Sequence, residues 1–168
     1  ADGSNISGAT GSSLLLGQAQ VGKAISVNAS YTDSYGTAES VSSTSTAKVA
    51  NINDTPTGSV SINGTAIQGQ TLTATNNLAD VDGLGVISYQ WQADGSNISG
   101  ATGSILVLGQ AQVGKAIGVI ASYNDNYGTA EKVSSTITAK VASINLVSNN
   151  HTPTGSVSIN GTAIQGQT

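Results

Sequence analysis

The sequence contains no cysteine, and charged residues make up only 8% of it. Without cysteine the chain has no disulfides, no zinc thiolate sites and no thiol catalysis. The net charge is −4 and there is no arginine, so the clustered cations that nucleic acid binding requires are missing. The longest apolar runs are a few residues, and we expect no membrane insertion. Ser, Thr, Asn, Gln and Gly must therefore cover most of the surface.

An internal repeat dominates what the sequence does contain. The string ADGSNISGATGS begins at Ala1 and returns at Ala93, an offset of 92, and only nine positions differ between residues 1–52 and 93–144. The string TPTGSVSINGTAIQGQT begins at Thr55 and returns unchanged at Thr152, an offset of 97. The period fits one small β-sandwich of about 100 residues better than a solenoid turn. Each repeat is therefore predicted to be a whole domain.

The repeat divides the chain into four parts. Residues 1–55 correspond to the back of a preceding repeat, 56–145 to a complete one, 146–152 to a linker insertion and 153–168 to the front of a following one. We interpret the chain as a window cut from a longer array, because it has no methionine and no signal peptide.

Short alternating segments predict an all-β fold of tandem immunoglobulin-like antiparallel sandwiches. The expected strands follow Gly- and Asn-rich turns at intervals of about 8–12 residues. The clearest is 87–92, where Ile87, Tyr89 and Trp91 share one face and Trp91 is expected in the core. The other expected strands are 60–63, 66–75, 104–108, 116–123 and 132–141, with a hairpin turn at 124–128.

The runs YQWQADGSNISGATGS and LGQAQVGKAIGVIASYNDNYGTAE, with a linker such as NINDTPTG, resemble the immunoglobulin-like repeats of giant bacterial surface proteins. These include RTX-type and biofilm-associated adhesins exported by type I secretion. The resemblance covers the whole chain and implies secreted spacer domains at the bacterial cell surface, often stiffened by calcium. The glycine-rich nonapeptide calcium repeats of RTX tails and a recognisable adhesive tip are absent from the sequence.

A calcium cluster at the domain junction is the main site hypothesis. Immunoglobulin topology places the incoming linker, the loop after the second strand and the last hairpin at one end of the domain. The candidate ligands there are Asn53, Asp54, Asp80, Asp82 and Asp125. Their oxygens are of the kind that Ca²⁺ prefers, and residues 51–56 also resemble the calcium-binding linker of cadherins. Asp-rich turns form without any metal, so this alternative stays open. The second linker lacks an acidic counterpart of Asp54 and is expected to bind calcium poorly and to bend more freely.

No enzyme is predicted. Residues 17–23 match P-loop spacing, but Ala24 stands where magnesium binding needs Ser or Thr, and a strand rather than a helix is expected next. The single histidine, His151, lies in a linker, so a Ser–His–Asp triad could form only around a linker residue.

Three functions remain. The first is a structural spacer, whose partners are the adjacent repeats of the same chain. The second is a subunit of a self-assembling extracellular filament or matrix, in which like chains meet. The third is a carbohydrate-binding accessory module of a secreted enzyme, for which Tyr35 and Tyr127 are the candidate exposed aromatics.

Overall fold

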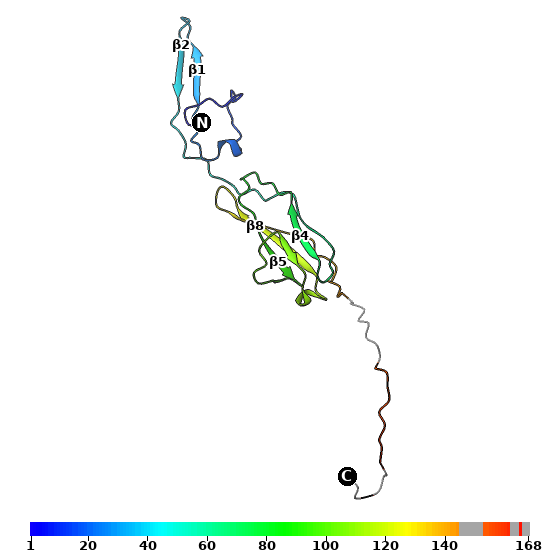
Figure 1. Ribbon diagram of the computed structural model, residues 1–168. Coiled ribbons are helices and arrows are strands. Elements are labelled where there is room, and N and C mark those ends of the chain that lie inside the picture. The colour runs from blue at the N-terminus through cyan, green and yellow to red at the C-terminus, as the bar shows by residue number, and fades with distance from the viewer. Residues whose placement is uncertain (145–152, 162–164, 166–168) are drawn as a thin grey trace.

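The computed structural model describes residues 1–144, 153–161 and 165, and over these residues the fold is all-β, as predicted (Figure 1). All pairings between its strands are antiparallel. Among the described residues no helix is long and apolar enough to cross a membrane. The strands are β1 (Asn28–Thr32), β2 (Ala38–Ser42), β3 (Val60–Asn63), β4 (Thr71–Asn76), β5 (Ser88–Ala93), β6 (Ser96–Asn97), β7 (Ile105–Val107), β8 (Ile117–Asn124) and β9 (Ala130–Ser134), with short 3-10 turns η1 (Gln18–Gln20) and η2 (Gln110–Gln112).

Two sheets make up the central unit, which spans residues 56–144. One sheet has the order β3-β4-β7 and the other β6-β5-β8-β9. The longest pairing joins β5 to β8, from Ser88 opposite Ser122 to Ala93 opposite Ile117. The two sheets enclose one hydrophobic core, an arrangement consistent with a β-sandwich.

Trp91 lies at the centre of that core. Its side chain is fully buried, and its indole Nε1 donates a hydrogen bond of 2.8 Å to the carbonyl oxygen of Gly103. A buried indole needs such a partner, because leaving its N–H without an acceptor would be costly. Leu72 of β4 and Val119 of β8 are equally inaccessible and bring both sheets to the same core. The predicted core position of Trp91 therefore agrees with the structure.

The strand bounds differ from prediction in three places. The segment 66–70 forms an isolated bridge at Ile67 and is not part of β4, which begins at Thr71, and β6 was missed. The closing strand is also shorter than the predicted 132–141, because β9 ends at Ser134. Beyond that point the hydroxyls of Ser135 and Thr138 accept hydrogen bonds from the amides of β8, at 3.1 and 3.0 Å. Side-chain acceptors thus replace the backbone carbonyls of a regular ladder.

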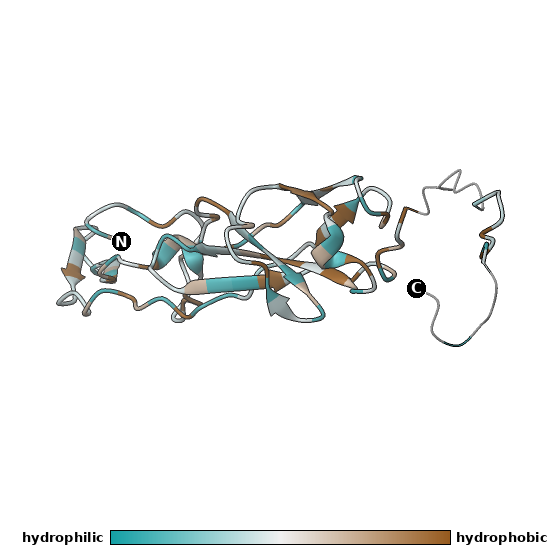
Figure 2. Cartoon of the chain, turned by 60° about the horizontal axis from the view of Figure 1, so that its bottom comes forward, coloured by the Kyte–Doolittle hydropathy of each residue, from teal (hydrophilic) through white to brown (hydrophobic). Residues whose placement is uncertain are grey.

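The N-terminal part repeats the back of the central unit without its front. β1 pairs with β2 in the register in which β8 pairs with β9, 92 positions later. Every residue of β1 and β2 is nevertheless exposed. Figure 2 shows hydrophobic segments along both parts of the chain. The N-terminal hairpin therefore closely matches β8 and β9 in sequence and register, but its side chains are exposed.

At the other end, residues 153–161 have no regular secondary structure and are exposed. The predicted linker insertion, including His151, lies outside the described residues.

Equivalent leucines in the two copies provide the first prediction. Leu108 is 1% exposed, whereas Leu16, its counterpart 92 positions earlier, is 47% exposed. Leu108→Ala is expected to lower the free energy of unfolding by about 2–5 kcal/mol, because it leaves a cavity in the core. Leu16→Ala, the matched control, should change it by less than about 0.5 kcal/mol. Urea unfolding followed by the fluorescence of Trp91, the single tryptophan, measures both. Equal losses would contradict the described difference in burial.

Candidate functional site

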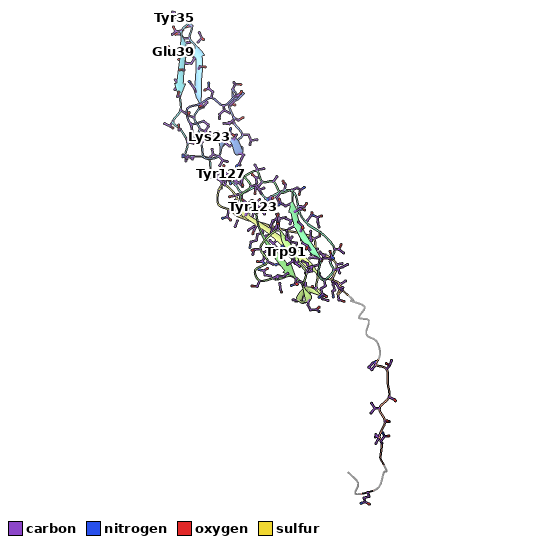
Figure 3. The ribbon with its side chains drawn as sticks, in the orientation of Figure 1. Lys23, Tyr35, Glu39, Trp91, Tyr123 and Tyr127 are labelled. Carbon is purple, nitrogen blue, oxygen red and sulfur yellow. The ribbon has the colours of Figure 1, made fainter. Side chains whose placement is uncertain are left out.

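Four segments meet where the N-terminal part joins the central unit. They are the η1 turn, the linker 51–54, the loop 80–83 between β4 and β5, and the turn 125–128 between β8 and β9. Figure 3 shows Tyr127 at the level where the two parts of the chain meet, with Trp91 inside the central unit and Tyr35 at the far tip of the N-terminal hairpin. We call this meeting point the junction.

Asp82 is the central residue of the junction. Its side chain is 1% exposed, and each carboxylate oxygen accepts a hydrogen bond. Oδ1 accepts from the side-chain amide of Gln18 at 2.9 Å, and Oδ2 accepts from the backbone N–H of Asp54 at 2.7 Å. Because a buried carboxylate without donors is strongly unfavourable, these two bonds are required for Asp82 to be buried at all. Asp82 is thus tied both to the preceding repeat and to the linker.

Gln18 is the residue of the preceding repeat that reaches across. It is the first residue of η1, which follows Gly17, and its amide nitrogen faces three oxygens. The shortest contact is to Asp82, while Asn51 Oδ1 and Tyr127 Oη lie at 3.5 and 3.4 Å, near the limit for a hydrogen bond. The P-loop-like run 17–23 therefore contains a 3-10 turn, and its function in this structure is to present Gln18.

The loop that carries Asp82 is held in shape by Asp80. Oδ1 of Asp80 accepts from the backbone N–H of Asp82 at 2.9 Å, and Oδ2 accepts from the hydroxyl of Tyr123 at 2.5 Å. Burial, and then the bond to Asp80, raises the pKa of Tyr123 above its usual value. Tyr123 is in β8, so Asp80 anchors the loop to the sheet.

Position 83 has a backbone conformation that residues other than glycine rarely adopt, and it lies close to the neighbouring turn. Gly83 has a φ of +99°, and a Cβ there would lie 2.0 Å from the side-chain nitrogen of Asn126. The backbone N–H of Asn126 also donates to the carbonyl oxygen of Asp82 at 3.2 Å. The loop 80–83 and the turn 125–128 are therefore in direct contact.

Asp125 builds the turn in which it lies. Its Oδ1 accepts from the backbone N–H groups of Tyr127 and Thr129 at 2.8 and 2.7 Å. Burial alone would raise the pKa of Asp125, but the hydrogen bonds from Thr129 and Tyr127 outweigh it and lower that pKa. Asp33 makes the same two bonds in the first copy, far from the junction. Both hairpins therefore use an Asp in this way, and the two bonds form without a ligand.

The predicted calcium ligands are placed as follows. Asp80, Asp82 and Asp125 lie in the two contacting loops, and Asp54 contributes its backbone N–H. Asn53 instead donates from its side chain to Glu131 of β9 at 2.8 Å. The structure thus brings the linker and both loops to one end of the domain.

Calcium coordination fits this arrangement only in part. Oδ2 of Asp125 is buried and has no hydrogen-bond partner among the described residues, as an oxygen reserved for a cation would be. Within that same part of the chain, however, no group of three or more Asp, Glu or His side chains gathers as a metal site would. Calcium needs six to eight oxygens, so calcium binding stays a prediction.

Sequence reasoning missed the residues that make the contact between repeats. Gln18 is a neutral residue in a motif without a matching function, and its partner lies 64 positions away. The only sequence signal at Gln18 is that its segment is repeated at Gln110, where the same 3-10 turn forms.

Gln110 also provides the control for a test of the junction. Gln18→Ala removes the donor to Asp82, and the angle between the two parts is expected to vary more widely. Gln110→Ala, the same change 92 positions later, should leave the junction as it is. Because the chain has no cysteine, Tyr35→Cys and Thr102→Cys can carry spin labels at unique positions. The width of the distance distribution between the labels is the measurement, and equal widths in the two variants would contradict a junction held by Gln18.

Comparison with known proteins gives no relatives for this chain. No family model matches it, and neither a curated protein nor a solved structure does. What the chain does must therefore be argued from the repeat and the junction.

Proposed function

We propose that the chain belongs to the spacer region of an extracellular bacterial adhesin. In such a protein, repeats in series hold a distal binding module away from the cell and support surface attachment or biofilm formation. The adjacent repeats are the main partners of each domain, and no catalytic role is assigned. The proposal rests on the near-identity of the copies and on how two of them meet.

An immunoglobulin-like architecture of each repeat is part of the proposal. Within the central unit the first, second and fifth strands form one sheet, and the third, sixth and seventh lie in the other. Immunoglobulin-type sandwiches distribute these six strands in the same way, but they place the fourth strand beside the first, second and fifth, whereas the fourth strand of this unit, β6, pairs with β5. Parallel bridges from Ile67 to Ala142 and from Val113 to Val141 join the C-terminal end of the unit to two earlier segments.

The bond between Gln18 and Asp82 is the observation that carries the spacer function. A spacer must be stiff where its domains meet, since each domain is already rigid inside. Here a side chain of one repeat binds a buried carboxylate of the next, and Asn53 of the linker binds Glu131. The two parts lie one after the other along an extended chain (Figure 1). The junction thus supports an array that holds its length.

The carbohydrate-binding alternative has less support in the described residues. Sugar-binding faces usually present exposed aromatic rings, and the single tryptophan is in the core. Tyr35 is 95% exposed, but it stands at a hairpin tip, and Tyr127 is in contact with Gln18. The filament alternative remains a competitor, because the N-terminal part exposes apolar side chains.

Calcium binding at the junction predicts a change in thermal stability. With millimolar calcium the melting temperature should be at least about 5 °C higher than with chelator, because a cation that binds only the folded state stabilises it. Asp125→Asn should remove this difference. Asp33→Asn, which alters the equivalent turn away from the junction, should keep it. An unchanged melting temperature in the original chain would show that hydrogen bonds alone hold the junction.

The proposed location has its own test. Antibodies raised against the chain are expected to label producing cells equally well with and without permeabilisation, because spacer repeats stand outside the cell. An antibody to a cytoplasmic protein of the same cells is the control and should need permeabilisation. Labelling that appears only after permeabilisation would contradict an extracellular spacer. Regular polymers of the purified chain in electron micrographs would favour the filament instead.

A further inference from the structure

The N-terminal part exposes an apolar face whose equivalent in the central unit is buried. We define this face by Leu14, Leu16, Val27 and Tyr31, which are between 39% and 64% exposed. Their counterparts 92 positions later are Leu106, Leu108, Val119 and Tyr123, which are at most 8% exposed. The same residue types in the same order are thus covered in one copy and uncovered in the other.

The backbone under the apolar face already has the conformation of a complete repeat. The bridge between Val21 and Val49 corresponds to the one between Val113 and Val141. The hydrogen bond from Asp2 N to Ala24 O, 3.0 Å long, corresponds to a bond of 2.9 Å from Asp94 to Ala116. The difference between the copies is therefore one of covering strands and not of local fold.

The central unit shows which strands cover such a face. Leu72 of β4 and Trp91 of β5 are fully buried in its core, and β5 pairs with β8 along six positions. In the N-terminal part, β1 pairs only with β2 among the described strands, so the edge that would receive a β5 is open. A single added strand, such as β5 in the central unit, would pair with the open edge and cover part of the apolar face.

The backbone at Ala1 matches that at the end of β5 in the central unit. Ala1 occupies the position of Ala93, the last residue of β5. The turn that follows is the same in both copies, with φ of 47° at Asp2 and 48° at Asp94. A strand that ran into Ala1 would therefore enter beside β1 as β5 enters beside β8.

We propose that the apolar face binds a polypeptide segment with the sequence of residues 56–92, whose last strand pairs with the open edge of β1. The two then form a second sandwich with the core and the strand order of residues 56–144. This inference goes beyond the spacer function, since it rests on the internal repeat and not on where the protein is used.

The other exposed stretch of front sequence is a poorer partner. Residues 153–161 carry Val157 and Ile159, the counterparts of Val60 and Ile62, and both are almost fully exposed. They correspond to β3 alone, and β3 hydrogen-bonds to β4 rather than to β8. A second copy of the chain that offered this stretch would leave the open edge of β1 unpaired.

The test places a second copy of residues 56–92 directly before Ala1 of the full chain. Amide hydrogen exchange at Ser30 and at the other positions of β1 is expected to slow at least about 100-fold and to approach that of β8, because local opening would then require the new core to open. The matched control carries Trp91→Asp in the added copy only and should leave β1 as unprotected as in the original chain. Equal exchange in the two fusions would overturn the proposal.

A second pair of variants separates this proposal from self-association. Tyr31→Asp should abolish the protection in the fusion and should leave the melting of the central unit unchanged, because Tyr31 does not belong to that core. Sedimentation of the original chain is expected to show a monomer. A dimer in which the amides of β1 are protected would overturn the proposal and assign the apolar face to a second copy.

Discussion

A buried carboxylate must find hydrogen-bond donors for both of its oxygens, and Asp82 finds them in two separate parts of the chain. One donor is the side-chain amide of Gln18 in the preceding repeat, and the other is the backbone N–H of Asp54 in the linker. Two further hydrogen bonds hold the backbone of Asp82. Its N–H donates to the Asp80 carboxylate, and its carbonyl oxygen accepts from the backbone N–H of Asn126. Without these donors the charge would have to remain in water, and the loop could not pack against the neighbouring repeat.

The junction and the core depend on each other. Tyr123 packs in the core with its ring and binds Asp80 with its hydroxyl, so the loop that presents Asp82 is anchored to the sheet of Trp91. A repeat that lost its core would therefore also lose the hydrogen bond between Asp82 and the preceding repeat. Conversely, residues 1–52 show what a repeat is without its front strands: the turns and the hairpin persist, but the apolar side chains stay exposed. Stability within repeats and stiffness between them therefore come from the same strands.

Much of the fold could be predicted from the sequence, because alternation and turn residues are local signals. The strand containing Trp91 and the hairpin at 124–128 were located to within a residue or so. The end of β9 could not be predicted, since Ser135 and Thr138 look like ordinary strand residues until their hydroxyls meet the amides of β8. For the junction, topology alone brought the linker and both loops to one end. The contact of Gln18 with Asp82 could not be predicted, because a neutral glutamine carries no sequence signal for a partner in the next repeat.

The coupling between Gln18 and Asp82 tests the central claim most directly. Gln18→Ala, Asp82→Ala and the double variant form a cycle, with the unfolding free energy of the central unit followed by Trp91 fluorescence. A hydrogen bond to a buried charge predicts a coupling energy of about 1 kcal/mol or more, so that the second substitution costs much less once the first is made. Additive losses, with a coupling energy near zero, would contradict a junction built on this contact.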